Sequence, residues 1–399
     1  MKKVLLLGGA AAQVPSVKKA KELGYYTITC DYLPDNPGHK FADEYHNVST
    51  TDKDAVLKLA RKLKIDGIVC YASDPAAETA AYVSEKMGLA GHPYKSVEIL
   101  ANKDLFRKFL AENGFNTPKA NGYVKAEDIK NDWHLFKKPI MIKPVDSSGS
   151  KGITKIERLE DIDKAFEYAL SFTRAKRIVV EEYIEAYGGQ ILGEGFSVDG
   201  KLVFAEYANH HFDKDAINPY TPSGGSWPSK MPKRVLDNIN SEIQKVFSLL
   251  NMKSGAYNFE ARIDKDENVY LMEIGPRNGG NMIPQVIQYA TGFDMVEYTI
   301  KAAMGESCCC LDKFRLNGCF SYYVLHSNKA GFFDSLDIDS EFAKKNLVEL
   351  NLMKKQGDEV LKFSGAGCSL GVMILKFENE AEMHTKMNNM SEYVKVVLK

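Results

Sequence analysis

The sequence predicts a protein of combined α/β and α+β class. Through the first hundred residues, short apolar runs alternate with helical stretches, which is typical of a parallel sheet with helices on its faces. After residue 100, several strand-like runs end in charged residues, and two of them are spaced as adjacent antiparallel strands. With 399 residues, 44% hydrophobic and 26% charged, the chain is long enough for roughly two to four domains.

The N-terminal region is expected to form a parallel, doubly wound sheet. Its predicted elements are strands at 3–7, 26–30 and 67–71, a tight turn at 8–12 and a helix at 15–24. In such a sheet the carboxyl ends of the strands form a binding edge. An acidic residue, Asp31, about twenty positions past the glycine turn invites a dinucleotide-binding interpretation. The GxGxxG fingerprint is absent, however, since Ala10 follows Gly8 and Gly9, so this interpretation is disfavoured.

The next stretch combines a helix, a strand and a Gly/Ser-rich loop. Residues 96–111 predict a helix that carries Lys103 about one turn into its apolar periodicity. Residues 139–143 predict a strand that ends in Lys143, and residues 146–152 read Asp-Ser-Ser-Gly-Ser-Lys-Gly. Backbone N–H groups and hydroxyls of such a loop can wrap phosphate oxygens. A Gly/Ser loop alone is most often a turn, but the strand-terminal lysine favours a flap over phosphates.

A further strand, at 177–182, ends in Glu181 and Glu182 and is followed by Tyr183 and Ile184. An adenine ring needs an apolar slot, an acceptor for its exocyclic amine and a backbone donor for a ring nitrogen. This segment offers all three. The alternative is that the two carboxylates are simply a solvated strand end.

The most informative pair of residues is Glu260 and Glu273. Each of them follows apolar residues in a run that predicts a strand. The charged turn at 264–268 separates the two runs, so they are expected to be adjacent antiparallel strands. Their carboxylates could then converge on one hard cation. Arg277, four residues past the second Glu, is suitably placed to hold a phosphoryl group that the same cation bridges. The alternative is an ordinary surface ion pair.

Taken in this order, the segments closely resemble the ATP-grasp superfamily over essentially the whole chain. The resemblance implies a pre-ATP-grasp α/β domain at 1–101, an ATP-grasp module of two α+β subdomains at 102–310 and a small β-rich C-terminal domain at 311–399. The lid subdomain would cover about 120–187. The C-terminal region is similar to that of L-amino acid ligases and proteins related to carbamoyl-phosphate synthetase.

The resemblance also assigns roles to individual residues. ATP would be bound by Lys103, Lys143, the loop residues Ser147, Ser148, Gly149, Ser150, Lys151 and Gly152, the adenine-slot residues Glu181, Glu182, Tyr183 and Ile184, and Glu194 at the ribose. Mg²⁺, with Mn²⁺ as an alternative, would be held by Glu260 and Glu273. The catalytic residues would be Arg277, Lys143 and Asn278.

Two positions depart from the family pattern. The second metal Glu is usually followed two residues later by an Asn that also binds the metal, and this chain has Gly275 there. Either water or Asn278 would fill the place, or the metal affinity would be lower than is usual in the family. The ribose-binding acid usually stands where this chain has Gly195. Glu194 is one residue away, which reverses its face on a strand unless Gly195 forms a bulge.

For the acceptor substrate the sequence offers only candidates. Residues 209–212 and 220–228 are expected to form a polar and aromatic loop in which His210 or His211 could accept a proton from an amine. Gly279 and Gly280, after the phosphoryl Arg, are further candidates. The alternative is that the two histidines are surface structure.

The function implied by the resemblance is ATP-dependent ligation of a carboxylate to an amine. Transfer of the γ-phosphoryl group to the carboxylate gives an acyl phosphate, and attack by the amine gives an amide or peptide bond with ADP and phosphate as products. The alternatives are a bicarbonate-using carboxylase or carbamoyl-phosphate-type phosphotransferase, and a non-catalytic nucleotide-binding subunit. The sequence leaves the two substrates and the oligomeric state open, although homodimers are common among similar proteins.

Charge and hydrophobic patterning limit the classes of partner that we expect for this protein. A formal net charge of −1 gives no electrostatic reason to expect nucleic acid or an anionic membrane. No run approaches the ~20 apolar residues of a membrane span, and the chain passes from Met1 directly into a strand, so we expect a cytoplasmic protein with small-molecule substrates. The seven cysteines include a run at 308–310. They lack the spacing of a tetrahedral metal site and are expected to be buried, reduced thiols.

Overall fold

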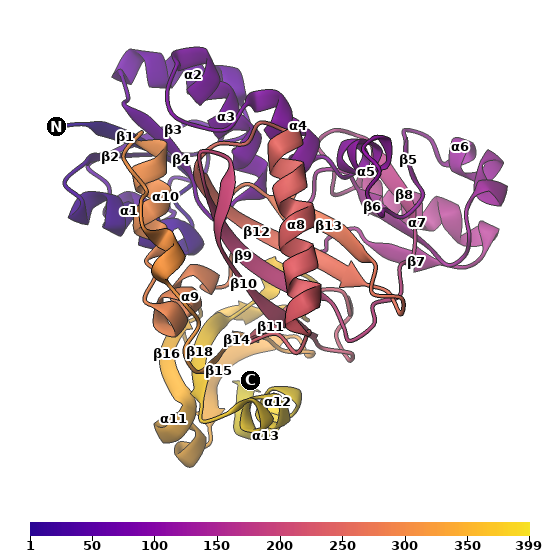
Figure 1. The fold of residues 1–399 in the computed structure, drawn as a ribbon. Helices are drawn as coiled ribbons and strands as arrows, with labels where there is room; N and C mark the ends of the chain where they lie inside the picture. The colour runs from indigo at the N-terminus through magenta and orange to yellow at the C-terminus, as the bar shows by residue number, and fades with distance from the viewer.

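The computed structural model describes residues 1–399, the side chain of Asp312 excepted. Four groups of strands build the molecule: a four-stranded parallel sheet, a four-stranded antiparallel sheet, an eight-stranded sheet and a three-stranded sheet. Figure 1 shows the N-terminal part at one side, the four-stranded antiparallel part projecting at the other, and the C-terminal part below the long central sheet. The expected α/β and α+β class is confirmed.

The N-terminal sheet has the strand order β3-β2-β1-β4, and all its pairs are parallel. Its elements are β1 (Lys3–Leu7), α1 (Val14–Glu22), β2 (Tyr26–Asp31), β3 (Glu44–Asn47), α2 (Lys53–Leu63), β4 (Gly67–Cys70) and α3 (Asp74–Met87). Alternate residues of β1 face opposite layers: Leu5 packs in the cluster with α2, and Leu6 packs in the cluster with α1. The doubly wound arrangement is thus as expected. The short edge strand β3, which is half-buried and polar, was not anticipated.

The expected helix over 96–111 is two helices. α4 (Tyr94–Ala101) ends and α5 (Lys103–Glu112) begins at Asn102, whose backbone is extended, with φ −112° and ψ 111°. The Asn102 side chain donates hydrogen bonds to Glu98 O at 2.9 Å and to Glu78 Oε1 at 2.8 Å. An asparagine that bonds to nearby backbone and side-chain groups competes with the helical pattern, and this explains the break.

The projecting lid contains an antiparallel sheet of order β5-β8-β6-β7. Its elements are β5 (Ala120–Tyr123), α6 (Ala126–Asn131), β6 (Ile140–Pro144), β7 (Thr154–Ile156), α7 (Ile162–Leu170) and β8 (Ile178–Glu182). Apolar residues of β6 and β8, among them Ile142 and Val180, pack with α7 residues such as Phe166 in one cluster. The loop at 146–152 connects β6 to β7.

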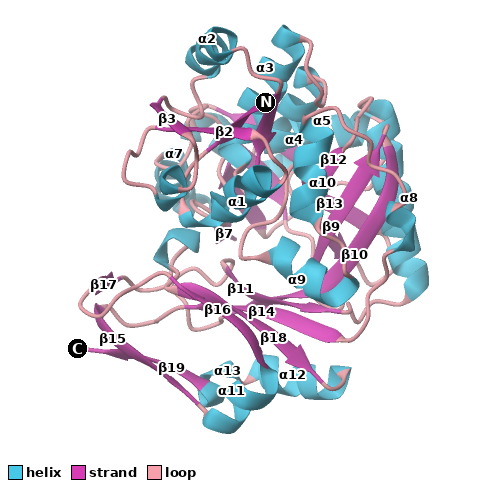
Figure 2. Cartoon of the chain, turned by 90° about the vertical axis from the view of Figure 1, so that its left-hand side faces the viewer, coloured by secondary structure: helices cyan, strands magenta, loops and turns pink.

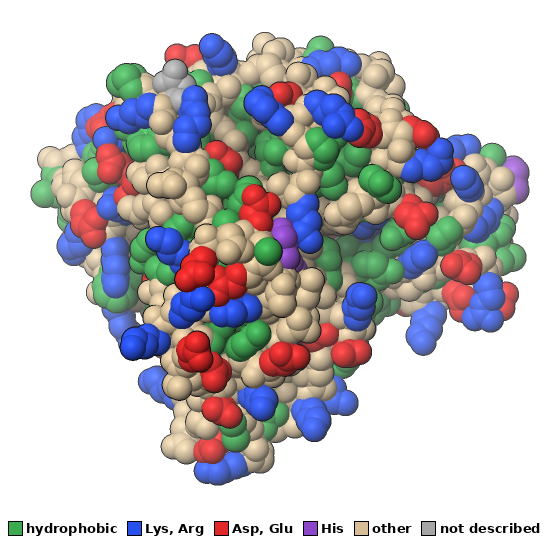
Figure 3. Space-filling model, turned by 60° about the horizontal axis from the view of Figure 1, so that its bottom comes forward, with side chains coloured by type: hydrophobic (Ala, Val, Ile, Leu, Met, Phe, Trp, Pro, Cys, Tyr) green, Lys and Arg blue, Asp and Glu red, His purple; other side chains and the backbone are tan. Residues whose placement is uncertain are grey.

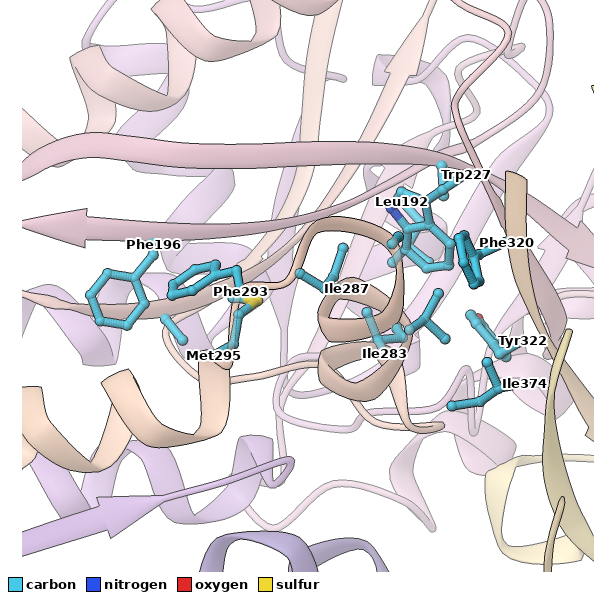
Figure 4. Packing of buried hydrophobic residues seen from close by; sticks show 14 of the residues in the cluster. Leu192, Phe196, Trp227, Ile283, Ile287, Phe293, Met295, Phe320, Tyr322 and Ile374 are labelled. Carbon is cyan, nitrogen blue, oxygen red and sulfur yellow. The ribbon is translucent and has the colours of Figure 1, made fainter. Parts of the chain in front are cut away.

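The central sheet has the order β13-β12-β9-β10-β11-β14-β18-β16. Its strands are β9 (Ile191–Val198), β10 (Lys201–Phe212), β11 (Pro222–Trp227), β12 (Gly255–Ile263), β13 (Val269–Gly275), β14 (Cys319–Leu325), β16 (Leu347–Leu352) and β18 (Gly371–Phe377). The helix α8 (Lys233–Leu249) covers one face through residues such as Ile239 and Phe247. α9 (Ile283–Thr291) and α10 (Met295–Ala303) pack on the other face, where Ile283, Phe293 and Trp227 join one cluster (Figure 4).

The C-terminal region is rich in strands, as expected. β15 (Gly331–Ile338), β17 (Glu359–Val360) and β19 (Val394–Leu398) form the three-stranded sheet. α13 (Met390–Tyr393) contacts β19, and α11 (Ser340–Asn346) and α12 (Glu380–Asn388) contact β18 of the central sheet (Figure 2). Three further strands, β14, β16 and β18, extend the central sheet. The central sheet therefore continues across the expected boundary near residue 310, and the proposed domain limits remain a prediction.

The surface and the cysteines complete the description. On the face shown in Figure 3, acidic and basic side chains are interspersed. No helix of the described residues has the length and apolarity that a membrane crossing requires. Cys30, Cys308 and Cys319 are buried as expected, but Cys309 and Cys310 are exposed, so that part of the expectation is wrong. Consecutive residues in an irregular segment after α10 cannot all face the interior.

Candidate active site

The two predicted metal carboxylates face each other in the structure. β12 and β13 are antiparallel, and Glu260 lies opposite Glu273 in their register, with a shift of register just after Glu260. The turn between the strands is held by Asp264, whose Oδ1 accepts hydrogen bonds from the backbone N–H groups of Asp266 and Asn268 at 2.9 Å each. The expected hairpin, with both carboxylates on one side of it, is confirmed.

The electrostatics of this pair suit a divalent cation. Burial, together with the facing carboxylate of Glu273, raises the pKa of Glu260 to about 7. Burial also acts on Glu273, but the nearby cations Lys103 and Arg277 outweigh it and lower the pKa of this group. Two like charges placed directly opposite each other are unfavourable unless a cation lies between them. Carboxylate oxygens are the ligands that Mg²⁺ prefers, so the residues present fit this ion.

The helix break at Asn102 aims Lys103 at this pair. Lys103 is the first residue of α5, and its backbone N–H donates to Val145 O at 3.0 Å. Its Nζ lies 3.5 Å from Glu273 and donates to Ser147 O at 2.9 Å. The lysine was expected one turn inside a helix, and this position is wrong. The structure instead places it between the carboxylates and the loop over them.

Lys143 and Glu181 meet diagonally across two neighbouring antiparallel strands, a contact that the sequence did not predict. β6 pairs with β8, and Lys143 Nζ donates to Glu181 Oε1. Arg107 on α5, which sequence reasoning missed, donates through Nε to Glu181 Oε2 at 2.9 Å and through both Nη atoms to Met272 O at 3.0 Å. Burial alone would raise the pKa of Glu181, but Arg107 and Lys143 lower it to about 2. Glu181 is therefore a buried ionised group and not a solvated strand end.

A cavity of about 400 Å³ opens between the lid and the central sheet. Of the expected residues it is lined by Lys143, Ser150, Tyr183 and Glu260. Additional lining residues that the sequence did not single out include Met141, Gln190, Tyr220, Arg262 and Met272. The apolar side chains of Met141 and Met272 beside polar groups are typical of a site for a flat heteroaromatic ring.

The other expected slot residues, Glu181, Glu182 and Ile184, are not among the residues that line this cavity. Glu182 Oε1 accepts from Lys137 N at 2.7 Å, and Glu182 N donates to Lys119 O at 3.0 Å. Ile184 O accepts from Arg262 Nη1 at 2.8 Å, and the Arg262 guanidinium lies 5.2 Å from the Tyr183 ring centroid. These contacts fix the segment that follows β8.

The Gly/Ser loop lies between the lid and the C-terminal region. Its turn uses left-handed backbone at Gly149 (φ 66°), Ser150 (φ 57°) and Gly152 (φ 72°). Ser150 O accepts a hydrogen bond of 2.7 Å from the buried Asn218, whose Nδ2 also lies 3.4 Å from Ser364 O. At the start of the loop, Asp146 accepts from Thr173 Oγ1 at 2.6 Å. The loop is thus anchored at its base and touches both neighbouring regions.

The loop after β13 carries Arg277 and is bound on several sides. Arg277 Nε donates to Asp74 Oδ1 at 2.6 Å, and its Nη1 donates to Asn278 O at 3.0 Å. Asn278 Oδ1 accepts from Thr299 Oγ1 at 2.9 Å, while Asn278 Nδ2 is buried without a hydrogen-bond partner among the described groups. Asp74 could not be predicted as the partner of Arg277, because it lies 203 positions away in α3.

Glu194 supports the same loop. The register of β9 is regular at Gly195 with both neighbouring strands, so the bulge considered for this position is not formed. Glu194 is fully buried, accepts from Asn258 Nδ2 at 2.6 Å and accepts from Gly279 N at 3.2 Å. Burial raises its pKa to about 8. A Cβ on Gly279 would lie 2.3 Å from Glu194 Oε1, so a larger residue there would have to displace this carboxylate. Glu194 therefore supports the loop that contains Gly279, and its contact with ribose remains a prediction.

The acceptor candidates lie on strands and not in a loop. His210 and His211 belong to β10, and residues 222–227 form β11, so the expected polar loop is wrong. Its polar and aromatic residues pair across the strands, with His210 opposite Gly225. Burial lowers the pKa of His210 to about 3 and that of His211 to about 4. His211 Nε2 lies 2.8 Å from Ser226 Oγ. Gly280 follows the Glu194-bound Gly279 in open space.

Comparison with known proteins agrees with this geometry. Residues 136–285 match a family model described as an ATP-grasp domain, a family whose typical cofactors are ATP and Mg²⁺. The chain is 28% identical over 301 residues to the formate-dependent phosphoribosylglycinamide formyltransferase of Prochlorococcus marinus, covering 74% of this chain and 75% of that one. It is 25% identical over 294 residues to the carbamoyl phosphate synthase large chain of Caldanaerobacter subterraneus, covering 72% of this chain and 26% of that protein.

The chain therefore spans about a quarter of the length of that carbamoyl phosphate synthase relative. Among solved structures, an L-amino acid ligase from Bacillus licheniformis superposes with a TM-score of 0.84 at 18% identity, covering 100% of this chain and 99% of that chain. At this identity the likeness concerns the fold. The matched region and the fold lead to one conclusion: residues 136–285 of this chain form an ATP-grasp domain.

Proposed function

We propose that the protein is an ATP-dependent ligase that converts a carboxylate into an acyl phosphate and joins it to an amine. The observation that carries the proposal is the convergence of two facing carboxylates, Glu260 and Glu273, with Lys103 and with Arg277 just beyond the second strand. This set can hold a cation and the phosphates that it bridges, and it can stabilise charge that moves with a phosphoryl group.

Each part of the site has a task in this scheme. Adenine would occupy the 400 Å³ cavity beside Tyr183 and Met272, with Lys143 toward the phosphates. Glu260 and Glu273 would hold Mg²⁺, which when bound supplies a Lewis acid that neutralises phosphate charge. Lys103 would bind a phosphate oxygen once it leaves Ser147 O. The loop at 146–152 would exclude water, because an acyl phosphate hydrolyses in an open site.

Arg277 would stabilise the phosphoryl group during transfer to the substrate carboxylate. The amine would then attack the acyl carbon, forming the C–N bond while phosphate leaves, and the amine proton passes to a base. His210 is a candidate for this base because its Nδ1 is buried without a partner among the described groups, but the burial that lowers its pKa makes the ring a weak base. Asn278, Gly279 and Gly280 would lie near the acceptor.

The likeness to an L-amino acid ligase and to a formate-dependent formyltransferase supports a carboxylate donor and an amine acceptor. The likeness to carbamoyl phosphate synthase supports a second candidate, in which bicarbonate is phosphorylated. A screen of ADP release over pairs of acids and amines separates the two. The ligase requires both an acid and an amine, whereas the second candidate predicts bicarbonate-dependent ADP formation without any amine.

A further inference from the structure

Arg277 is held by a carboxylate that belongs to another part of the chain. Asp74 is the first residue of α3, in the N-terminal sheet region, and its Oδ1 lies 2.6 Å from Arg277 Nε and 2.5 Å from an Arg277 Nη atom. Arg277 is 9% exposed at its side chain. One carboxylate oxygen that accepts from both nitrogens restrains this edge of the guanidinium.

The remaining nitrogen of the guanidinium is also engaged. Arg277 Nη1 donates to Asn278 O at 3.0 Å. Contacts from α3 and from the loop after β13 therefore orient the guanidinium group together. Asn278 is itself held by Thr299 of α10. One edge of the guanidinium is thus set by Asp74, and the neighbouring edge is set by the loop that follows β13.

The absence of a side chain at residue 275 makes room for this contact. A Cβ added to Gly275 would lie 3.1 Å from Asp74 Oδ1 and 3.3 Å from the Arg277 guanidinium. Both distances are tighter than ordinary van der Waals contact. Gly275 and Asp74 also line one polar cavity of about 310 Å³, together with Lys103 and Glu273. The carboxylate of Asp74 therefore enters the candidate active site from the N-terminal region, next to the metal carboxylate.

We propose that Asp74 is a positioning residue, supplied by the N-terminal region, that orients Arg277 for phosphoryl transfer. The inference rests on the proposed function of Arg277. Its physical basis is preorganisation: a guanidinium held in place by a buried partner does not have to reorient when negative charge develops on the phosphoryl group. The N-terminal α/β region then contributes to the reaction directly, through the binding edge at the end of β4.

The test is a kinetic comparison of Asp74→Asn and Asp74→Ser, since both residues are compatible with the first turn of a helix. We expect kcat for ADP release to fall about 10- to 100-fold, as for other groups that orient a catalytic group, while KM for MgATP stays within about threefold. A matched control is Asp294→Asn. Asp294 also bridges to the N-terminal region, through Lys19 at 3.0 Å, and this variant should keep the parental kcat.

A double-mutant cycle decides whether Asp74 acts through Arg277. In an Arg277→Lys background, Asp74→Asn should lower kcat by less than about threefold, because the partner it orients is already lost. The inference is overturned if Asp74→Asn lowers kcat by the same factor in both backgrounds. It is equally overturned if Asp74→Asn leaves kcat unchanged or raises it, since a rise would mean that Asp74 restrains Arg277.

Chemical labelling separates this inference from the proposed function. If the parent protein releases no ADP with any acid and amine, the proposed function is wrong. The role of Asp74 is then tested by measuring, with mass spectrometry, the rate at which phenylglyoxal modifies Arg277. Asp74→Asn should speed labelling of Arg277 several-fold and leave Arg234, an exposed arginine, unchanged. Equal labelling rates of Arg277 in the parent and the variant would show that Asp74 does not hold the guanidinium.

Discussion

Replacement of Glu273 by Gln is the most direct test of the candidate metal site. The variant keeps the size of the side chain but removes one of the two negative charges that face each other across β12 and β13. Removal of one preorganised electrostatic partner from a reacting group typically costs about 2.7–4 kcal/mol of transition-state stabilisation. We therefore expect kcat for MgATP turnover to fall by about 10²–10³.

The same variant should leave the fold intact. Without metal, Glu273→Gln weakens the contact with Lys103, at 3.5 Å, but it also removes the like charge that helps to raise the pKa of Glu260. These effects oppose each other, so the melting temperature without Mg²⁺ should stay within about 3 °C of the parent. The pKa of Glu260 should fall toward its ordinary value. A loss of activity without a loss of stability is expected of a metal ligand and not of a core contact.

The assay is ADP release at saturating MgATP, with thermal unfolding in EDTA as the companion measurement. Glu267→Gln is the matched control, because it makes the same substitution in the turn of the same hairpin, where Glu267 pairs with Arg234 at the surface. Exposed pairs of this kind contribute little, so the control should keep the parental kcat. If turnover of Glu273→Gln stayed within about threefold of the parent, the metal assignment would be refuted. The loss of a metal ligand should lower turnover by a much larger factor.

Three further predictions follow from the same geometry. Limited trypsin digestion should cut after Lys151 in the nucleotide-free protein, and a non-hydrolysable MgATP analogue should suppress the cut; equal cleavage in both states would make the loop at 146–152 an ordinary turn. Because the pKa of Glu260 is about 7, its proton competes with Mg²⁺ below that pH, so apparent Mg²⁺ affinity from activity titrations should weaken as pH falls and level off above it. If a Glu260→Gln variant kept the same pH dependence of Mg²⁺ affinity, a group other than Glu260 would be responsible for it. Arg277→Lys should lower kcat far more than ATP affinity, and an ¹⁸O-labelled carboxylate substrate should transfer label to the released phosphate; unlabelled phosphate would contradict the acyl phosphate.

Local sequence patterns predicted the parts of the site that lie on continuous strands. Lys143 and Glu181 lie next to the last residues of β6 and β8, and Glu260 faces Glu273 across one hairpin. Each of these placements depends on period-two alternation and on a short turn, which a single segment encodes. Pairing of neighbouring strands then brings the side chains together.

Contacts between distant segments could not be predicted in this way. The break at Asn102 depends on Glu78 of α3, and the position of Arg277 depends on Asp74. Arg107 interrupts the apolar face of α5, and nothing near it in the sequence indicates that its partner is Glu181. These residues satisfy one another's buried charges, and such pairing is decided by tertiary packing and not by local propensity.

The nucleotide-free site shows a consistent pairing of charges. Three of the cations assigned to the nucleotide are each paired with one carboxylate: Lys143 with Glu181, Lys103 with Glu273 and Arg277 with Asp74. Glu260 differs, since its Oε2 accepts from the amide of Gln190 at 2.8 Å, and this agrees with its raised pKa.

This pairing has a consequence for ligand binding. A free nucleotide polyanion would have to compete with three carboxylates for these cations, whereas a magnesium complex carries less negative charge and gives Glu260 and Glu273 a cation of their own. Nucleotide affinity should therefore depend strongly on Mg²⁺. Isothermal titration calorimetry with ATP, in EDTA and in excess Mg²⁺, measures the two affinities directly. Equal affinities in the two conditions would mean that the carboxylates do not compete with the phosphates for these cations. The same charge balance would let a protein of net charge −1 hold a polyanion, because the paired cations would be released to phosphate together with the metal.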